Sequence, residues 1–163
     1  MSARTKARKR AVDAVFAADL RKISPLTLLD EVAVLTADRQ NQDEIFGYAR
    51  QIVNGVIENY DEIDDLLDTY SQGWAIDRMP NLDRAILRCA VWEIMHNDEV
   101  PDAVAINEAV EMAKELSTDD SGSFIDKELR FRRTHSTSTT SDKCDFAFKT
   151  RFSHKGNSTR RLV

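Results

Sequence analysis

The chain has 163 residues, a length that suits one domain, and 42% of them are apolar, which is enough to bury one compact core. It contains only five glycines and three prolines, whereas Ala, Leu, Glu, Asp and Arg are abundant, a composition that favours helices. No apolar run approaches the roughly 18 residues of a membrane-spanning helix, and no apolar secretory core follows the basic N-terminus. We therefore expect an all-α cytoplasmic protein with no membrane segment.

The net charge of −5 conceals a strong asymmetry along the chain. Residues 1–10 carry five basic groups and no acid, and residues 25–124 carry 6 basic and 22 acidic groups. Residues 125–163 carry 10 basic and 4 acidic groups. An acidic body with basic ends suits a protein that contacts phosphates locally without binding polyanions over its whole surface. The alternative is that the charged ends only solvate the termini.

The first predicted helix covers residues 3–20 and has one apolar face. The side chains on that face are Val12, Val15, Phe16, Leu20 and Ile23. At about 100° per residue, Arg8 and Lys9 flank this apolar stripe. Lys6 and Arg10 point away from it. Because cations surround the first turns, we expect this end to fray until a polyanion orders it.

Six further helices are predicted from apolar residues at helical spacing. They run from Ser24-Pro25 to Leu35, from Asp43 to Tyr60, from Ile63 to Tyr70, from Leu82 to about His96 and from Pro101 to Leu116, and a short seventh helix begins before Phe124. After Leu129 the chain is basic, rich in Ser and Thr, and without apolar period. We therefore expect a helical domain over residues 1–130 and a disordered tail over residues 131–163.

The sequence contains no constellation typical of catalysis or metal binding. Cys89 and Cys144 lack metal-ligand spacing, and Cys89 has the apolar neighbours of a buried thiol. The three histidines form no metal-binding group, and neither a phosphate-binding glycine loop nor a nucleophile elbow occurs. We expect a protein that is not an enzyme and that holds no cofactor and no metal.

Three segments together carry a resemblance to a known family. They are TKARKRAVDAVFAADL at residues 5–20, NLDRAILRCAVWE at residues 81–93, and VPDAVAINEAVEMAKELSTDD at residues 100–120, followed by Phe124. In this order they resemble the NusB family, over roughly residues 3–125. The resemblance implies a bundle of about seven helices in two packed subdomains, without enzymatic activity. It also implies binding to the boxA element of nascent ribosomal RNA transcripts, together with the ribosomal protein NusE, in the antitermination complex of RNA polymerase.

The resemblance implies an RNA surface as well. The residues that match the Arg-rich segment of the family are Arg4, Lys6, Arg8, Lys9 and Arg10, and the matching aromatic residues are Phe16, Tyr70 and Phe124. Cationic side chains neutralise phosphates and release counterions. Single-stranded bases stack on aromatic rings. Core packing is the alternative for Phe16, and the ring of Tyr70 can pack while its hydroxyl stays in water.

Two pairs of charged residues complete the implied site. Asp83 and Arg84 match the helix that faces NusE in the family, and the alternative places them in a solvent-facing first turn. Asp119 and Asp120 match the acidic pair before the last helix of the family. We expect Asp120 on the RNA surface, with helix capping as the alternative for this pair.

The chain departs from the family pattern after Phe124. Asp126-Lys127 stands where the family usually has Asn-Gly, and Glu128 replaces an apolar residue, although Leu129 still matches. A changed reading frame or a lineage-specific basic tail would explain the difference. In either case we expect the core to lack its closing helix.

Two other functions remain open from the sequence. One is the helical RNA-binding domain that accompanies RNA cytosine methyltransferases, although the sequence contains no catalytic domain. The other is a protein-only scaffold or homodimer, whose basic ends serve solubility alone. Salt-dependent RNA binding distinguishes this scaffold from an antitermination factor. If the chain is an antitermination factor, we expect reversal of Lys6, Arg8 and Arg10 to Glu to abolish RNA binding while helical content stays almost unchanged.

Overall fold

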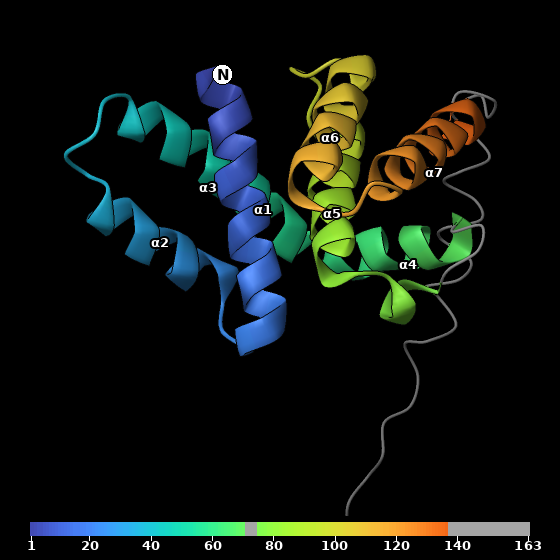
Figure 1. Ribbon diagram of the computed structural model, residues 1–163, viewed down its shortest axis with the longest axis horizontal. Coiled ribbons are helices and arrows are strands. Elements are labelled where there is room, and N and C mark those ends of the chain that lie inside the picture. Colours follow the sequence, from blue (N-terminus) through green and yellow to red (C-terminus); the bar gives the residue numbers. More distant parts are fainter. Residues whose placement is uncertain (71–74, 137–163) are drawn as a thin grey trace, which may run out of the picture.

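The computed structural model describes residues 1–70 and 75–136, and for Tyr70 and residues 131–136 the backbone alone. In these ranges the secondary structure is helical throughout, with no strand (Figure 1), which confirms the all-α class. The elements are α1 (Ala3–Arg21), α2 (Pro25–Leu35), α3 (Gln42–Glu58), α4 (Tyr60–Tyr70), the 3₁₀ helix η1 (Ile76–Arg78), α5 (Asn81–His96), α6 (Asp102–Leu116) and α7 (Ser121–Ser136). None of these helices is long and apolar enough to cross a membrane.

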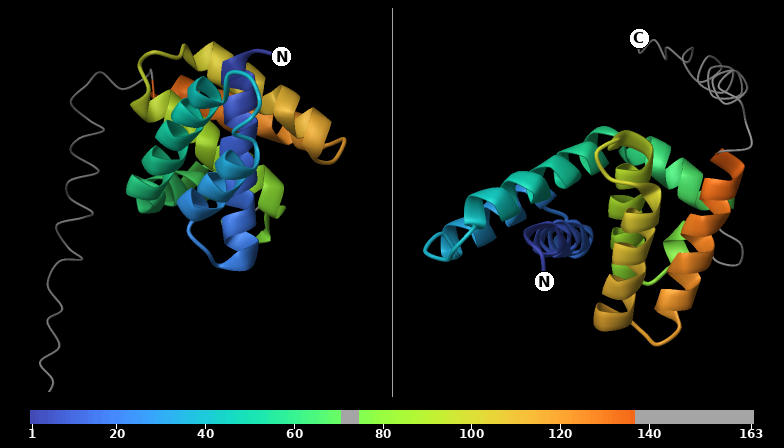
Figure 2. Two further views of the ribbon diagram at one scale, coloured as in Figure 1. Left: turned by 90° about the vertical axis from the view of Figure 1, so that its left-hand side faces the viewer. Right: turned by 90° about the horizontal axis from the view of Figure 1, so that it is seen from above.

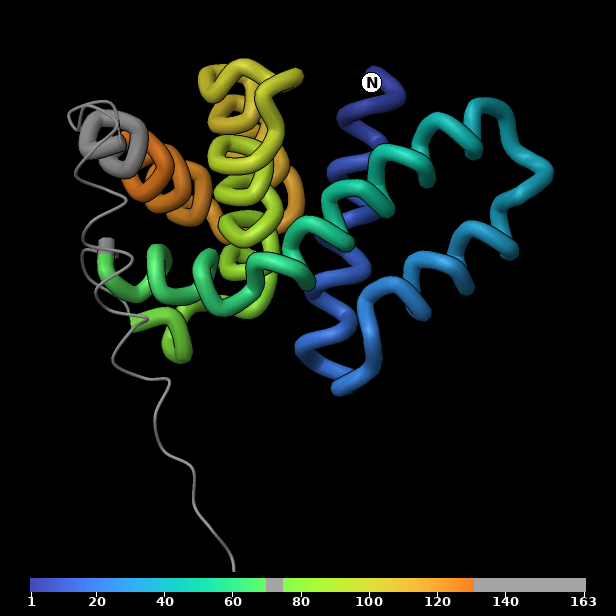
Figure 3. Tube along the Cα trace, turned by 180° about the vertical axis from the view of Figure 1, so that it is seen from behind, coloured from blue at the N-terminus to red at the C-terminus, as the bar shows by residue number. Residues whose placement is uncertain are grey.

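The helices form two groups, α1–α3 and α4–α7, and α1 lies along the boundary between them. Helix α1 contacts α2 and α3 in its own group and α5 in the other group. The right-hand view of Figure 2 looks along the axis of α1 and shows this helix with α2 and α3 on one side and α5 and α6 on the other. On the opposite side, α3 and α4 follow one another across the back of α1 and α5 (Figure 3). The predicted pair of packed subdomains is therefore present.

One continuous apolar core joins the two groups. Its largest fully buried side chains include Leu29, Ile52, Ile63, Leu67, Ile86, Leu87, Ile106, Ile125 and Leu129, which come from six of the seven α-helices. At one crossing between the groups, Gly55 of α3 lies directly against Trp92 of α5. A Cβ atom at Gly55 would lie 1.8 Å from Trp92 Nε1, so only glycine fits this crossing. The core therefore depends on contacts between the two groups.

The helix expected over residues 43–60 ends earlier than predicted. Helix α3 stops at Glu58, and α4 begins at Tyr60. Between them, the Asn59 side chain donates from Nδ2 to the Gly55 carbonyl at 2.8 Å, and its backbone N–H donates to the same oxygen at 3.1 Å. Asn59 thus closes the last turn of α3 with both its backbone and its side chain, and its own backbone departs from helical geometry, so the chain changes direction there.

The expectation of a missing closing helix is wrong. Helix α7 packs on α6, and its Ile125 and Leu129 side chains are fully buried in the core. It continues to Ser136, past the predicted domain boundary at residue 130. The remaining part of the expected tail, residues 137–163, lies outside the described residues. Burial of two apolar side chains one turn apart is what holds the polar sequence of α7 against the bundle.

Candidate nucleic-acid interface

The basic N-terminal end of α1 is anchored at its first residues. The Ser2 side chain accepts a hydrogen bond from the backbone N–H of Thr5 at 3.0 Å, which caps the helix. Thr5 Oγ1 in turn donates to Glu108 of α6 at 3.3 Å. The expectation that this end frays is therefore wrong, because both the cap and contacts with α6 hold it.

Arg8 is the most deeply buried cation of the N-terminal segment, with 5% of its surface exposed. Its Nε donates to both carboxylate oxygens of Glu93 in α5, at 3.0 and 2.9 Å, and Nη1 lies 3.6 Å from Glu108 Oε2. Burial alone lowers the pKa of the Arg8 guanidinium, but the hydrogen bonds and charge of Glu93 raise it above its usual value. The guanidinium is therefore held inside the protein by Glu93, with Glu108 close by.

Glu93 is the centre of a buried polar cluster, which we call the Glu93 cluster: Arg8, Tyr48, Glu93 and Asn97. The Tyr48 hydroxyl donates to Glu93, and Asn97 Nδ2 donates to the Tyr48 oxygen at 3.2 Å. Burial, followed by the hydrogen bond with Glu93, raises the pKa of Tyr48 above its usual value. Because its members come from α1, α3 and α5, the cluster ties the two helix groups together.

Arg4 and Lys9 extend the same contact toward the surface. Arg4 pairs with Glu99 at 3.3 Å and lies over the Tyr48 ring, with Cζ 4.6 Å from the ring centroid. Lys9 Nζ lies 2.5 Å from Glu115 Oε2 of α6. These pairs retain exposed atoms, because 46% of the Arg4 side chain and 56% of the Glu115 side chain are accessible. They can therefore exchange partners when an anion approaches.

Lys6 and Arg10 differ from the other N-terminal cations, because they form no ion pair with any residue that the structure describes. Lys6 is exposed and Arg10 is half-buried. Of the five predicted phosphate-binding residues, Lys6 is exposed and Arg10 half-buried without an ion pair to a described residue, Arg4 and Lys9 pair with exposed carboxylates, and Arg8 is buried. Reversal of Arg8 would place a carboxylate beside Glu93, so from these contacts we expect the triple reversal to destabilise the helices, in place of the sequence-based expectation that helical content stays almost unchanged.

The predicted aromatic residues do not form one exposed surface. Phe16 and Phe124 are each partly buried and pack against the core cluster. Core packing therefore accounts for part of each ring, and the remaining part faces water. The side chain of Tyr70 lies outside the described residues. Phe16 and Phe124 are thus only partly available to RNA, and the prediction for Tyr70 stays untested.

Asp83 is a buried structural residue, which corrects its predicted role as a partner contact. Only 1% of its surface is exposed. Its two carboxylate oxygens accept hydrogen bonds from Ser117 Oγ at 2.6 Å and Ser121 Oγ at 2.8 Å. Asp83 thereby fastens the first turn of α5 to the turn between α6 and α7. The solvent-facing alternative is excluded for Asp83 by the same burial.

Arg84 belongs to a second polar cluster, at the other end of α1, which we call the Arg88 cluster: Asp19, Asp64, Arg84 and Arg88. Arg84 donates to Asp19 at 3.1 Å, and Arg88 donates to Asp19 at 2.7 Å and to Asp64 at 2.8 Å. Only 15% of the Arg84 side chain is exposed. Arg84 therefore offers little surface to a partner, and its main contacts join α1 to α5.

Asp119 and Asp120 remain exposed before α7. Among the described residues, neither carboxylate has a hydrogen bond or an ion pair. The Asp120 carbonyl accepts from the Phe124 N–H at 3.1 Å, so Asp120 occupies the N-cap position of α7 through its backbone and not through its side chain. The turn is held instead by the hydroxyls of Thr118 and Ser121, 2.8 Å apart. Asp120 is thus accessible to RNA or to a partner, as the sequence suggested.

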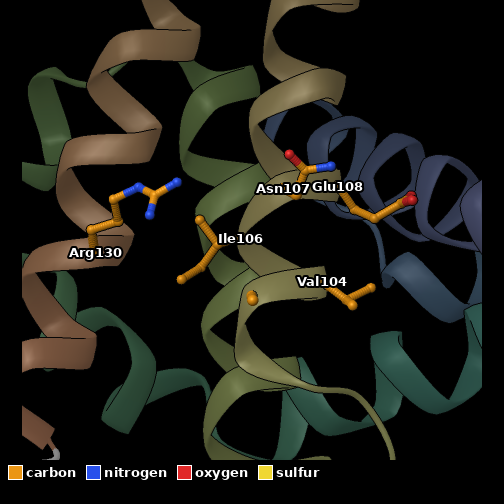
Figure 4. A pocket seen from close by; sticks show the side chains of 6 residues that line it. Val104, Ile106, Asn107, Glu108 and Arg130 are labelled. Atoms are coloured by element: carbon orange, nitrogen blue, oxygen red, sulfur yellow. The ribbon is translucent and has the colours of Figure 1, made fainter.

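A hollow of about 330 Å³ lies between α6 and α7, close to the basic end of α1 (Figure 4). Its lining residues are Ala103, Val104, Ile106, Asn107, Glu108 and Arg130. Arg130 extends from α7 toward α6, and Glu108 also contacts α1 through Thr5 and Arg8. No group of three or more potential metal ligands occurs in the described part of the chain. The hollow therefore borders the candidate RNA surface without the ligands of a metal site.

The sequence analysis missed Tyr48 and Glu93. Tyr48 lies on the apolar face of α3, three residues after Ile45 and four before Ile52, and Glu93 follows the buried run that ends at Trp92. A hydroxyl and a carboxylate on apolar helix faces need buried partners, since an unpaired buried charge is costly. That signal predicts a buried cation, although it does not say which one.

The comparisons with known proteins agree with this architecture. A family model described as the NusB family matches residues 5–126. The chain belongs to the NusB family. The transcription antitermination protein NusB of Leifsonia xyli subsp. xyli (strain CTCB07) is 56% identical over 125 residues, which cover 77% of this chain and 87% of the relative. The NusB of Clavibacter sepedonicus is 52% identical over 126 residues, 77% of this chain and 91% of the relative.

Solved NusB structures share the fold. NusB of T. maritima superposes with a TM-score of 0.70 at 30% identity, covering 78% of this chain and 87% of that chain. A crystal structure of the antitermination factors NusB and NusE in complex with dsRNA gives a TM-score of 0.70 at 26% identity, covering 80% of this chain and 95% of that chain. These relatives are named for transcription antitermination and not for a catalysed reaction, in agreement with the expectation that the chain is not an enzyme.

Proposed function

We propose that this chain is a cytoplasmic transcription antitermination factor that binds the boxA element of nascent ribosomal RNA together with NusE, in the antitermination complex of RNA polymerase. Family membership and relatives named as transcription antitermination proteins support this function. The related structure of NusB and NusE with dsRNA supports RNA and NusE as the partners. The observation in this chain that carries the proposal is the pair of unpaired cations, Lys6 and Arg10, on the first turns of α1.

The RNA surface follows from the way the N-terminal cations are partnered. Lys6 and Arg10 are available to neutralise phosphates directly, and Arg4 and Lys9 can join them by leaving exposed carboxylates. The Glu93 cluster holds the helix that presents them, so Arg8 acts as a positioning residue without touching RNA. Asp120 and the exposed edge of Phe124 stay in the proposal as the part of this surface near α7.

The acidic body supports a basic protein partner. Residues 25–124 carry 22 acidic and 6 basic groups, and opposite charges speed the encounter of two proteins. Neither Asp83 nor the larger part of Arg84 is accessible, so the NusE contact requires other residues of this body. A protein-only scaffold or homodimer is the second candidate. Val34 and Leu35 at the end of α2 favour it, because they are 77% and 79% exposed.

Fluorescence anisotropy of a short boxA-like RNA, titrated at two salt concentrations with and without NusE, tests the proposal. We expect tight binding that strengthens with NusE and weakens as salt rises. The double variant Lys6→Glu/Arg10→Glu should lose at least a hundredfold in affinity while remaining folded. Its matched control is Arg39→Glu/Arg78→Glu, which makes the same change of net charge at exposed positions in the loop before α3 and in η1.

The two candidate functions predict different outcomes. Equal losses in both double variants would show that only net charge matters and would exclude a specific surface on α1. Absence of RNA binding by the unaltered protein, in both salt conditions and with NusE present, would leave the protein-only scaffold. In that case, replacing Val34 and Leu35 by Ser should weaken protein association measured by analytical ultracentrifugation.

A further inference from the structure

Helices α1 and α2 enclose a groove that shares only Arg10 with the RNA surface proposed above. Its volume is about 170 Å³, and its lining residues are Arg10, Asp13, Ala14, Ala17, Arg21, Leu28, Leu29, Glu31 and Val32. The groove exists because α1 places the small side chains of Ala14 and Ala17 opposite the larger apolar residues of α2. It begins one helical turn beyond Lys6, and so continues directly from the unpaired cations at the N-terminal end.

The unpaired cations of α1 share one face of the helix. At 100° per residue, Lys6, Arg10 and Arg21 fall within about 60° of one another. They span about 22 Å along the axis at 1.5 Å per residue. Like Lys6 and Arg10, Arg21 forms no ion pair with any described residue. The cations on the opposite faces, Arg4 and Arg8, are neutralised by carboxylates of the α5–α6 side.

The lining of the groove is chemically mixed, which decides what kind of ligand it suits. The guanidinium groups of Arg10 and Arg21 are balanced in formal charge by the carboxylates of Asp13 and Glu31. A bare phosphate therefore gains little from net charge. A nucleotide matches the lining better, because arginine binds its phosphate, an apolar floor takes the face of its base, and carboxylates accept from base N–H groups.

The size of the groove points to one base. Pockets for drug-sized molecules have volumes of roughly 300–1,000 Å³. A volume of about 170 Å³ is smaller than that and accords with a single flat ring system. Leu28 and Leu29 are buried beneath α1 and close the bottom of the groove, so the apolar surface open to a ligand is that of the partly exposed Ala17 and Val32.

We propose that the α1–α2 groove binds one nucleotide of the single-stranded RNA whose backbone crosses Lys6 and Arg10. Arg21 contacts a phosphate at the far end, the base lies on Ala17 and the apolar side chains of α2, and Asp13 and Glu31 accept its N–H groups. This inference rests on the proposed RNA-binding function and adds Arg21, Asp13 and Glu31 to its site. It extends the RNA path from the N-terminal turns along the length of α1.

The decisive comparison is between two adjacent cations. Arg21→Gln and Lys22→Gln each remove one charge at an exposed position, but only Arg21 lines the groove. Anisotropy titrations with the same boxA-like RNA at several salt concentrations should show about a tenfold loss for Arg21→Gln. The slope of log affinity against log salt should fall by about 0.7, the value for one phosphate contact of a single strand. Lys22→Gln should retain the unaltered affinity within about twofold.

A second variant tests the base position without changing charge. Ala17→Leu fills the groove, and we expect about a tenfold loss of affinity with the salt slope unchanged, because every phosphate contact remains. Thermal unfolding should show that the variant is folded. A loss of stability instead of affinity would show that the groove is an internal packing space, which would overturn the inference.

Failure of this inference is distinguishable from failure of the proposed function. If Lys6→Glu/Arg10→Glu abolishes binding while Arg21→Gln and Lys22→Gln behave alike, the groove is not a nucleotide site and the RNA-binding function stands. If the unaltered protein binds no RNA, the proposed function fails before any groove variant is measured, and the inference fails with it.

Discussion

Lys6 and Arg8 are two residues apart in α1, yet their charges have opposite roles. Arg8 faces α5, is 5% exposed and donates twice to Glu93. Lys6 faces water and has no described ion pair. The cations in the first turns of α1 are divided in this way: those toward α5 and α6 are paired with carboxylates, and Lys6 and Arg10 have no ion pair with a described residue. Farther along α1 the polarity is reversed, because Asp19 pairs with Arg84 and Arg88 of α5.

This difference teaches that a basic segment is not one functional unit. Cations whose partners come from the same chain contribute to stability and orientation, since a buried charge without its partner is costly. Cations without partners are available to an external polyanion and make its binding salt-dependent. The two faces of α1 should therefore respond differently to substitution, one in the free energy of unfolding and the other in RNA affinity.

The largest expected effect is that of reversing Arg8. The triple variant Lys6→Glu/Arg8→Glu/Arg10→Glu places a third carboxylate beside Glu93 and Glu108, and we expect it to unfold at room temperature. The cost exceeds the roughly 3–5 kcal/mol of breaking a buried pair, out of about 5–15 kcal/mol for a typical domain. Circular dichroism should show loss of helix in the triple variant and native helix in Lys6→Glu/Arg10→Glu. Equal helical content in both variants would contradict the division of α1 into two faces.

A smaller loss of stability is expected when Glu93, the acidic partner of Arg8, is replaced. Glu93→Ala leaves the Arg8 guanidinium buried without its main partner and should lower the free energy of unfolding by about 3–5 kcal/mol, measured by urea denaturation. The matched control is Glu99→Ala, which removes the 71% exposed partner of Arg4 and should cost at most about 1 kcal/mol.

The paired substitution Arg8→Met/Glu93→Leu sharpens this test. Because it removes both charges together, it should recover a large part of the stability lost in Glu93→Ala. If it is instead as unstable as the single variant, the Tyr48 hydroxyl and Asn97 would carry more of the cluster than the ion pair does.

The smallest of these effects concerns two acidic residues, of which Asp83 is buried and paired and Asp120 is exposed. Asp83→Ala removes the acceptor of the Ser117 and Ser121 hydroxyls and should cost about 1–3 kcal/mol in thermal or urea unfolding. Asp120→Ala, at an exposed position, should change stability by less than about 0.5 kcal/mol. A loss of RNA or NusE affinity confined to Asp120→Ala would place that residue on the binding surface.

The sequence by itself determined the helices and most of their ends. Apolar side chains at helical spacing predict α1 to α6, because only a helix brings such residues onto one face. Pro25 and Pro101 lie at helix starts as expected, since proline lacks the N–H that a helix leaves unpaired there. The three segments that resemble the NusB family also identify the family, as the match to its family model confirms.

Only the tertiary structure decided which charged residues are available. Arg8 and Glu93 are 85 residues apart, and Asp83 meets hydroxyls 34 and 38 residues away. Helical periodicity shows which side chains share a face, but not which other helix covers that face. The closing role of α7 was missed for the same reason, because its polar composition hides two side chains, Ile125 and Leu129, that the bundle buries completely. Burial depends on partners distant in sequence, so it is a property of the packed fold rather than of any local pattern.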